Sequence, residues 1–240
     1  MAVAAAGLGR RYGEGSTAVE ALRGVTLGIE TGRMTAIMGP SGSGKSTLMH
    51  LLAGLDTPTD GSVHIDGVDI TRLSEKKLTL LRRETIGFVF QFFNLLPMLT
   101  AEENITLPLS IAGRKPEPGW LEELLETVGI AERRDHRPAE LSGGQQQRVA
   151  VARALITKPK VLFADEPTGN LDSTSSKEVL ALLRRAVDDW GQTIVMVTHD
   201  AGAAAMADRI LFIADGRIVR DLDESTAAEV LAAMQEVGSR

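Results

Sequence analysis

The residues best suited to chemistry in this chain form one glycine-rich segment. In order they are Gly39, Pro40, Ser41, Gly42, Ser43, Gly44, Lys45, Ser46 and Thr47. Their spacing fits a phosphate-binding loop, in which glycines let backbone amides turn toward phosphate oxygens and a helix start adds its dipole. Lys45 would reach the β- and γ-phosphates of a nucleotide, and the Ser46 hydroxyl would ligate Mg²⁺. The alternative is a glycine-rich turn that binds nothing.

Two adjacent carboxylates follow an apolar run farther along the chain. Val161–Ala164 predicts a strand buried on both faces. This strand delivers Asp165 and Glu166 to its carboxyl end, where open α/β sheets bind ligands. Neighbouring strand residues point in opposite directions, so we expect Asp165 to serve Mg²⁺ and Glu166 to serve the attacking water as general base. The alternative is an acidic pair where a strand meets a turn.

A second candidate anion site begins at Ser142. The sequence Leu141–Gln145 (Leu-Ser-Gly-Gly-Gln) precedes a predicted helix over Gln146–Leu155. Ser142 stands at the N-cap position, with Gly143 and Gly144 at the helix entrance. This pattern is typical of a simple helix cap or of an anion-binding helix start, and the phosphate loop in the same chain favours the second interpretation.

Two isolated side chains are further candidates. His199 follows the predicted buried strand Thr193–Val197, of the same type as the strand that delivers Glu166. A lone histidine is usually structural, but this placement favours a functional one. Tyr12, the only tyrosine of the chain, lies upstream of the phosphate loop; it is either a base-stacking residue or an ordinary strand aromatic.

Composition limits the class of protein. The chain has 240 residues, a net charge of −6 and a pI near 5.3, which argues against a nucleic-acid partner. It contains no cysteine, so it has no disulfide framework. The N-terminus does not have the pattern of a secretory signal, and no apolar stretch approaches the ~20 residues that span a bilayer. We therefore expect another chain to supply any membrane spans.

Periodicity and breakers predict alternating strands and helices. Residues 1 to 33 favour antiparallel strands, and residues 101 to 157 favour a charged helical insertion with breakers such as Pro108. The charged residues from 132 to 137 are expected to form a solvated face. Other predicted elements are strands at Met34–Met38, Ser62–Ile65 and Thr85–Phe90, a hairpin at Arg209–Ala214 and Arg217–Arg220, and helices at Ser46–Ala53, Leu78–Glu84, Trp120–Val128, Ser173–Trp190 and Ser225–Val237.

Large apolar residues crowd the segment after Gln91. Phe92–Leu99 reads Phe-Phe-Asn-Leu-Leu-Pro-Met-Leu, and Pro97 prevents one regular helix. We expect most of this segment to be core. The alternative is a partner-binding groove, because exposed apolar clusters mark contacts.

Taken in order, these motifs resemble those of the ATP-binding cassette (ABC) ATPases, the nucleotide-binding subunits of ABC transporters. The matching positions are Tyr12 (A-loop), Gly39–Thr47 (Walker A), Gln91 (Q-loop), Leu141–Gln145 (signature), Val161–Asp165 with Glu166 (Walker B), Gly169–Asp172 (D-loop) and His199 (switch histidine). The segment after Gln91 and the D-loop Gly-Asn-Leu-Asp are similar to the branch for lipoprotein release, macrolide export and cell division.

The resemblance implies an α/β fold: a P-loop NTPase (RecA-like) core with an N-terminal antiparallel β subdomain and an inserted helical subdomain. The core and β subdomain would comprise 1–90 and 158–240, and the Q-loop and helical signature subdomain 91–157.

The resemblance also implies a shared mechanism, with ATP and Mg²⁺ as cofactors. Two copies would sandwich two ATP molecules, with Ser142, Gly143, Gly144 and Gln145 of one copy covering the nucleotide held by the other. Tyr12 would stack on adenine, Gln91 would contact Mg²⁺ and the water, His199 would hold the γ-phosphate, and Asp172 would bridge the two sites.

A permease at the cytoplasmic face of the membrane would contact Phe92–Leu99, and ATP hydrolysis would drive export or extraction of a substrate. Two alternatives stay open at this point: a regulatory ATPase that signals through a membrane partner, and a soluble ABC ATPase outside transport.

Overall fold

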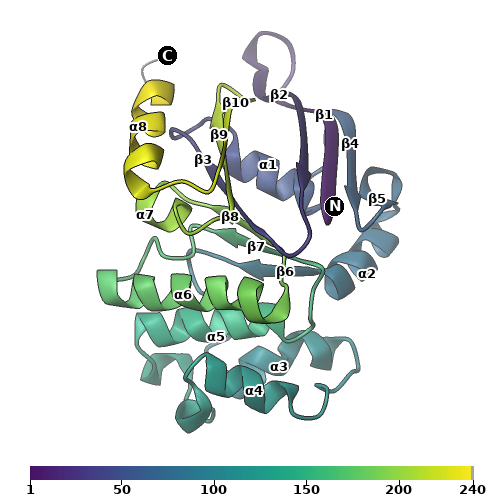
Figure 1. The fold of residues 1–240 in the computed structure, drawn as a ribbon. Coiled ribbons are helices and arrows are strands. Elements are labelled where there is room, and N and C mark those ends of the chain that lie inside the picture. Colours follow the sequence, from purple (N-terminus) through teal and green to yellow (C-terminus); the bar gives the residue numbers. More distant parts are fainter. Residues whose placement is uncertain (239–240) are drawn as a thin grey trace.

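The computed structural model describes residues 1–238, which form two β-sheets flanked by helices (Figure 1). The antiparallel sheet has the order β2-β1-β4-β5, with β1 Val3–Tyr12, β2 Val19–Ile29, β4 Asp60–Ile65 and β5 Val68–Asp69. The six-stranded sheet has the order β10-β9-β3-β8-β7-β6, with β3 Met34–Met38, β6 Ile86–Val89, β7 Val161–Asp165, β8 Ile194–Val197, β9 Arg209–Ala214 and β10 Arg217–Asp223. Its strands are parallel except for the edge strand β10.

The central strands of the six-stranded sheet consist mainly of apolar residues. Both faces of this sheet can therefore be covered, by helices or by the second sheet. Ile37 and Phe163 pack with helix α1 (Lys45–Leu52) and with the inner face of the antiparallel sheet. Met38 and Ala164 point to the opposite face and pack with the remaining helices. Helix α1 therefore lies between the two sheets, directly after the phosphate loop (Figure 1).

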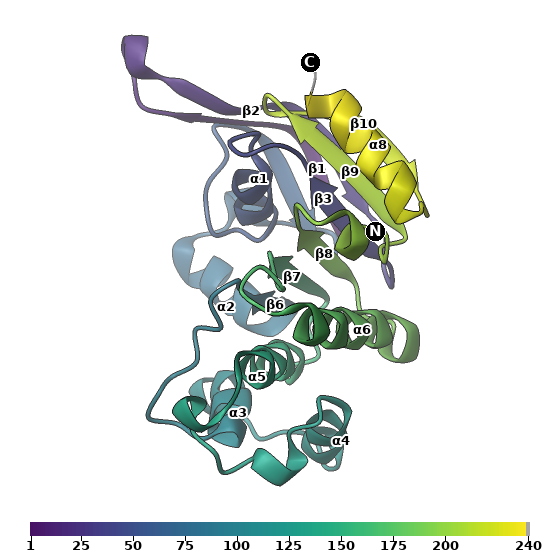
Figure 2. The same ribbon diagram turned by 90° about the vertical axis from the view of Figure 1, so that its left-hand side faces the viewer.

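The helices gather mainly on the second face and below it. They are α2 Glu75–Thr85, α3 Ala101–Ile111, α4 Trp120–Thr127, α5 Gly143–Leu155, α6 Ser173–Trp190, α7 Ala201–Ala204 and α8 Ala227–Gly238. Helices α3, α4 and α5 lie together at one end of the molecule (Figure 2), where α5 contacts both α6 and the edge strand β6. No helix in the described part of the chain is both long and apolar enough to cross a membrane.

One expectation for the helical region is wrong, and a second needs a correction at one residue. Pro108 lies inside α3 and does not end it. A capping box between Thr100 and Glu103 starts this helix, and its residue Ile105 is fully buried in the core. The charged face is exposed as expected at Glu132, Arg133, Asp135 and Arg137, but Arg134 is half-buried. It donates hydrogen bonds to Glu102 of α3 (2.5 Å) and to Glu122 of α4 (2.9 and 3.0 Å), so it joins two helices that the sequence left unconnected.

The apolar segment Phe92–Leu99 is not core, contrary to the first expectation. None of its residues is buried, and Phe92 and Met98 are 70% and 81% exposed. The segment is irregular and depends on side-chain bonds: Arg153 donates to the carbonyls of Phe93 and Asn94. Its apolar side chains are thus displayed on the surface.

Candidate functional site

The phosphate loop connects β3 to α1 through backbone conformations that only glycine adopts easily. Gly39 has a φ of 151° and Gly44 a φ of 105°. A Cβ at Gly39 would lie 2.0 Å from the Ile213 carbonyl oxygen, and one at Gly44 would lie 2.5 Å from that of Ala21. The loop shape therefore depends on the absence of side chains at both positions.

The loop surrounds a cavity of about 300 Å³. The loop residues that line it are Ser41, Gly42, Gly44, Lys45, Ser46 and Thr47, joined by Ala21, Glu166 and Val197. Lys45 Nζ donates to the carbonyl oxygens of Gly39 (2.9 Å) and Pro40 (2.8 Å). Burial lowers the pKa of Lys45, although Glu166 and Asp165 oppose that shift. Ser43 is buried behind the loop, and its hydroxyl has no partner among the described residues.

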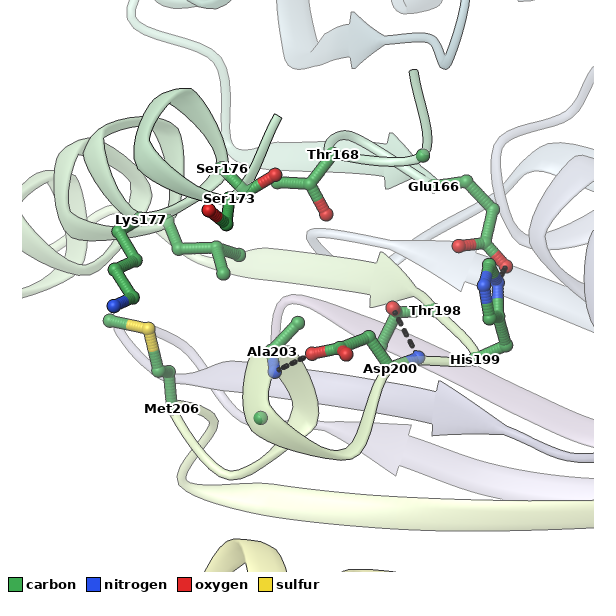
Figure 3. A pocket seen from close by; sticks show the side chains of 13 residues that line it. Glu166, Thr168, Ser173, Ser176, Lys177, Thr198, His199, Asp200, Ala203 and Met206 are labelled. Atoms are coloured by element: carbon green, nitrogen blue, oxygen red, sulfur yellow. Dashed lines mark hydrogen bonds and ion pairs between the residues drawn. The ribbon is translucent and has the colours of Figure 1, made fainter. Parts of the chain in front are cut away.

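Glu166 and His199 meet at the carboxyl ends of neighbouring strands. His199 Nδ1 lies 2.9 Å from Glu166 Oε1, and both side chains point toward each other at one end of a second cavity of about 580 Å³ (Figure 3). Glu166 is 18% exposed and His199 70%. Glu166 lines both cavities, so one carboxylate faces the phosphate loop and its own histidine.

Asp165 and Glu166 are adjacent in the chain but differ in backbone conformation. Asp165 is the last residue of β7, whereas Glu166 has a φ of 46° and has left the strand. The strand-pleat argument for their opposite directions therefore fails, although they do occupy different environments. The Glu166 amide donates to the Val197 carbonyl (2.9 Å), which ties this left-handed residue to β8.

Asp165 is half-buried at the end of β7. Burial raises the pKa of its carboxyl group, with a further contribution from Glu166, while His50 and Lys45 oppose the shift. Within residues 1–238 no group of three or more acidic, histidine or cysteine side chains could hold a metal. The Asp165 carboxylate and the Ser46 hydroxyl are oxygen donors, the ligand type of Mg²⁺, an ion that keeps several waters and binds through one or two carboxylates together with phosphates.

Gln91 contacts the segment between β7 and α6, and Asp172 is the last residue of that segment. Gln91 Nε2 donates to Asn170 Oδ1 (3.3 Å), and Asn170 Nδ2 donates to the Gln91 carbonyl (3.1 Å). Asp172 is the N-cap of α6 and accepts from the amides of Thr174 (2.9 Å) and Ser175 (3.0 Å).

The Ser142 loop lies apart from the phosphate loop. Ser142 caps α5 in a reciprocal pair: it accepts from the Gln145 amide (3.3 Å), and its own amide donates to Gln145 Oε1 (2.8 Å). A Cβ at Gly144 would lie 2.6 Å from Ser175 Oγ, so the loop packs closely on α6. No residue from Ser142 to Gln145 lines the cavity at the phosphate loop, and the start of α5 lies far from α1 in both views (Figures 1 and 2).

Tyr12 ends β1, and its ring is 41% exposed. It pairs with Val19 of β2, two positions before Ala21, which lines the phosphate-loop cavity. Of the sequence candidates, the phosphate-loop residues and Glu166 line one cavity, and Glu166 contacts His199. Gln91 contacts Asn170, and Asp172 and the start of α5 both lie against Ser175.

Gln147 connects α5 to the segments that follow β6 and β7, and it belongs to none of the motifs in the sequence. It is fully buried in α5, and its Nε2 donates to the carbonyls of Phe90 (3.1 Å) and Pro167 (2.6 Å), close to Gln91 and Glu166. Helical spacing from buried Ala150 and Val151 places Gln147 on the inner face of α5. That spacing was the available signal for a buried polar residue.

Comparisons with known proteins show the family of this chain. A family model described as "ABC transporter" matches residues 22–169. The chain belongs to the ABC transporter family. The family resemblance and the fold class expected from the sequence are thereby confirmed.

Relatives within the ABC transporter family have two different lengths. The macrolide export ATP-binding/permease protein MacB of Bdellovibrio bacteriovorus is 49% identical over 215 residues, which cover 90% of this chain and 33% of MacB. The lipoprotein-releasing system ATP-binding protein LolD of Geobacter metallireducens is 49% identical over 216 residues, covering 89% of this chain and 96% of LolD. This chain thus spans about a third of its MacB relatives and almost all of LolD.

Solved ABC structures have the same fold. The ATP-binding cassette MJ0796, in a dimeric post-hydrolysis structure with ADP and Pi, matches with a TM-score of 0.83 and 41% identity, over 93% of this chain and 99% of that one. A second dimeric structure of MJ0796 matches with a TM-score of 0.82.

Proposed function

We propose that this cassette hydrolyses ATP in a head-to-tail dimer and so drives a membrane permease, with export or extraction of a substrate as the result. One observation carries the proposal: the cavity at the phosphate loop includes Glu166 but no residue from Ser142 to Gln145. A nucleotide bound by one chain would thus keep one open side. The dimeric MJ0796 cassette with ADP and Pi supports closure of that side by a second copy.

The phosphate loop would bind the triphosphate. Its amides and Lys45 would contact the β- and γ-phosphates, and the nucleotide would replace the loop carbonyls that now accept from Lys45. Tyr12 would stack on the adenine. Ser46 and Asp165 would hold Mg²⁺, and Gln91 would contact it. When bound, Mg²⁺ supplies charge neutralisation at the phosphate oxygens.

Glu166 would act as general base. The oxygen of a water molecule attacks the γ-phosphorus, the bond to the bridging oxygen of ADP breaks, and Glu166 accepts the water proton. With His199 Nδ1 as donor, the 2.9 Å contact fixes Oε1, and the other carboxylate oxygen is free to take the proton. His199 would also contact the γ-phosphate.

The second copy would complete the site through the start of α5. The first amides of a helix have no intrahelical acceptor, and at this end they carry the positive part of the helix dipole. Ser142, Gly143, Gly144 and Gln145 would therefore cover the γ-phosphate held by the partner, while Asp172 would contact the facing site.

The exposed segment Phe92–Leu99 would receive the permease. It adjoins a groove of about 340 Å³ that includes Asn94, Phe90 and Arg153, and exposed apolar clusters mark protein contacts. The names of the relatives, an ATP-binding/permease protein and a lipoprotein-releasing ATP-binding protein, support such a partner. The cassette would then work at the cytoplasmic face of the membrane.

A complementation experiment tests the shared site. Ser142→Arg and Lys45→Ala chains should each be inactive alone. A mixed dimer contains one intact site and one doubly altered site, so random mixing should restore about a quarter of normal ATP turnover if the sites are independent. Two affinity tags establish that mixed dimers form. Absence of recovery in purified mixed dimers would contradict the proposal.

A second experiment tests the permease surface. Phe93→Ser combined with Leu96→Ser should abolish co-purification with the permease while basal ATP turnover persists. Val68→Ser is the matched control, because Val68 is an exposed apolar residue on the antiparallel sheet. Retained co-purification by the double variant would place the permease contact elsewhere.

A further inference from the structure

The ring of Tyr12 is held by two residues outside every motif, Arg10 and Asp56. The Tyr12 hydroxyl donates to Asp56 Oδ2 at 2.7 Å. Arg10 forms a two-point ion pair with the same carboxylate, with Nε 2.9 Å from Oδ2 and Nη2 2.8 Å from Oδ1. The Arg10 guanidinium also lies over the Tyr12 ring, 4.4 Å from Cζ to the ring centroid.

Asp56 is itself fixed to the end of α1. Its backbone amide donates to the His50 carbonyl (3.3 Å), and its side chain accepts from the Thr57 amide (2.7 Å). Helix α1 begins at Lys45 of the phosphate loop. The carboxylate that holds the Tyr12 ring is therefore attached to the far end of the same helix that starts at the phosphate site.

The charge of Asp56 suits this role. Burial raises the pKa of its carboxyl group, but hydrogen bonds from Tyr12 and Thr57 and the charge of Arg10 outweigh that effect and lower the pKa overall. The carboxylate is thus ionised at neutral pH, where charge-assisted hydrogen bonds are shorter and stronger than neutral ones.

We propose that Arg10 and Asp56 are positioning residues that clamp the Tyr12 ring as a preformed stacking platform for the nucleotide base. This inference rests on the proposed role of Tyr12. Arg10 lies over the ring, and the ring is 41% exposed, so the uncovered surface of Tyr12 is available to a base. A ring that is already fixed loses less conformational freedom when the base stacks on it.

The clamp makes the tyrosine hydroxyl functional without contact to the nucleotide. Any aromatic ring can stack on a base, so a free platform would tolerate Tyr12→Phe. A clamped platform would not, because phenylalanine loses the bond to Asp56 that sets the ring orientation. The clamp should also act on the base alone and leave the affinity of the phosphate loop unchanged.

The test compares ADP with pyrophosphate by titration calorimetry on the purified chain, because neither measurement depends on hydrolysis of ATP. Tyr12→Ala should weaken ADP binding about 10-fold, by the usual size of base–aromatic stacking. Tyr12→Phe, Asp56→Asn and Arg10→Gln should each weaken it about 3- to 10-fold, by the usual size of one hydrogen bond. Pyrophosphate affinity should stay unchanged in all of them.

Two controls separate positioning from general damage. Arg11→Gln changes the neighbouring arginine, which is exposed and has no side-chain bond among the described residues, and it should bind ADP normally. The double variant Tyr12→Phe/Asp56→Asn should be no weaker than the worse single variant, because the charge that Asp56→Asn removes acts on the ring mainly through the bond that Tyr12→Phe removes.

The outcomes distinguish the clamp from the role of Tyr12. If Tyr12→Ala leaves ADP affinity unchanged, Tyr12 does not stack on the base and both ideas fail. If Tyr12→Ala weakens ADP binding but Tyr12→Phe and Asp56→Asn do not, the clamp alone is refuted. Equal weakening of ADP and pyrophosphate would also refute it, since that result indicates damage to the phosphate loop.

Discussion

The six-stranded sheet with its phosphate loop and the helical region from α3 to α5 contribute unequal parts of the candidate site. In the sheet region, Lys45, Ser46 and Glu166 line one cavity, and Glu166 already contacts His199. In the helical region, Ser142 and Gln145 satisfy each other at the start of α5 and lie outside that cavity. Under the proposed function, the first region would supply most of the site in one chain, and the second would act only on the nucleotide of a second chain.

The two regions are joined through a few polar side chains. Gln147 connects α5 to the carbonyls of Phe90 and Pro167, and Gln91 is bonded to Asn170. These contacts lie directly beside Glu166 and the exposed segment Phe92–Leu99. Under the proposed function, these contacts would connect the nucleotide site to the proposed permease surface.

The largest predicted effect lies in the sheet region. Glu166→Gln should reduce ATP turnover about 100- to 10,000-fold, the usual contribution of a general base, while ATP still binds. Steady-state phosphate release and nucleotide titration measure the two quantities separately. His199→Gln is the comparison, and its turnover should fall less. Near-normal turnover by Glu166→Gln would remove this residue from the role of base.

ATP binding should be lost when a side chain distorts the backbone of the phosphate loop. Gly44→Ala places a Cβ 2.5 Å from the Ala21 carbonyl oxygen at a φ of 105°, so ATP affinity should fall at least about 10-fold. Gly42→Ala is the matched control for space, because a Cβ there meets no atom within 4 Å, although its φ of 78° is also positive. A normal affinity in Gly44→Ala would show that the loop shape is not needed.

The connection between the regions should matter for stability. Gln147→Leu keeps the approximate size but leaves the carbonyls of Phe90 and Pro167 without this donor, which should cost about 1–3 kcal/mol in the free energy of unfolding. Gln146→Leu is the control. It also removes a side-chain hydrogen bond, but that bond goes to the Leu141 carbonyl and is local to the start of the same helix. Equal, small losses in urea unfolding for both variants would mean that Gln147 does not join the regions.

The smallest effect is expected within the helical region. The bond from Arg134 lowers the pKa of Glu122. A lowered carboxyl pKa gives stability that is present above the unfolded-state pKa and is lost as the pH falls through the folded-state pKa. Arg134→Gln should therefore melt slightly below the wild type at pH 7, and the difference should shrink in acid. A difference that grows in acid would contradict this assignment.

The sequence predicted the local parts of the site well and the contacts between regions poorly. Glycine spacing, the apolar strand before Asp165 and the cap at Ser142 are local signals, and each element forms within a few residues of its expected bounds. The position of Phe92–Leu99 depends on Arg153, which is distant in the chain. The prediction that Pro108 breaks the helix is wrong because the capping box at Thr100 and Glu103 stabilises a helix that continues through this proline.

Other features that the sequence did not predict also depend on contacts between residues far apart in the chain. Asp56 and Gln147 act through partners 44 and 57 residues away along the chain, and no short motif encodes such pairs. The left-handed conformation of Glu166 depends on its bond to Val197 of the neighbouring strand. A strand-alternation argument has no means of detecting it.

Cross-linking tests the central claim most directly, because the chain contains no cysteine and an introduced pair reports on one distance. Ser41→Cys lies in the phosphate loop and Ser142→Cys at the start of α5; both positions are exposed. In a Glu166→Gln background, a short bis-maleimide should join these cysteines between two chains when ATP is added, and each single-cysteine chain alone should give no such product. No ATP-dependent dimer product, despite demonstrated ATP binding, would contradict the shared site.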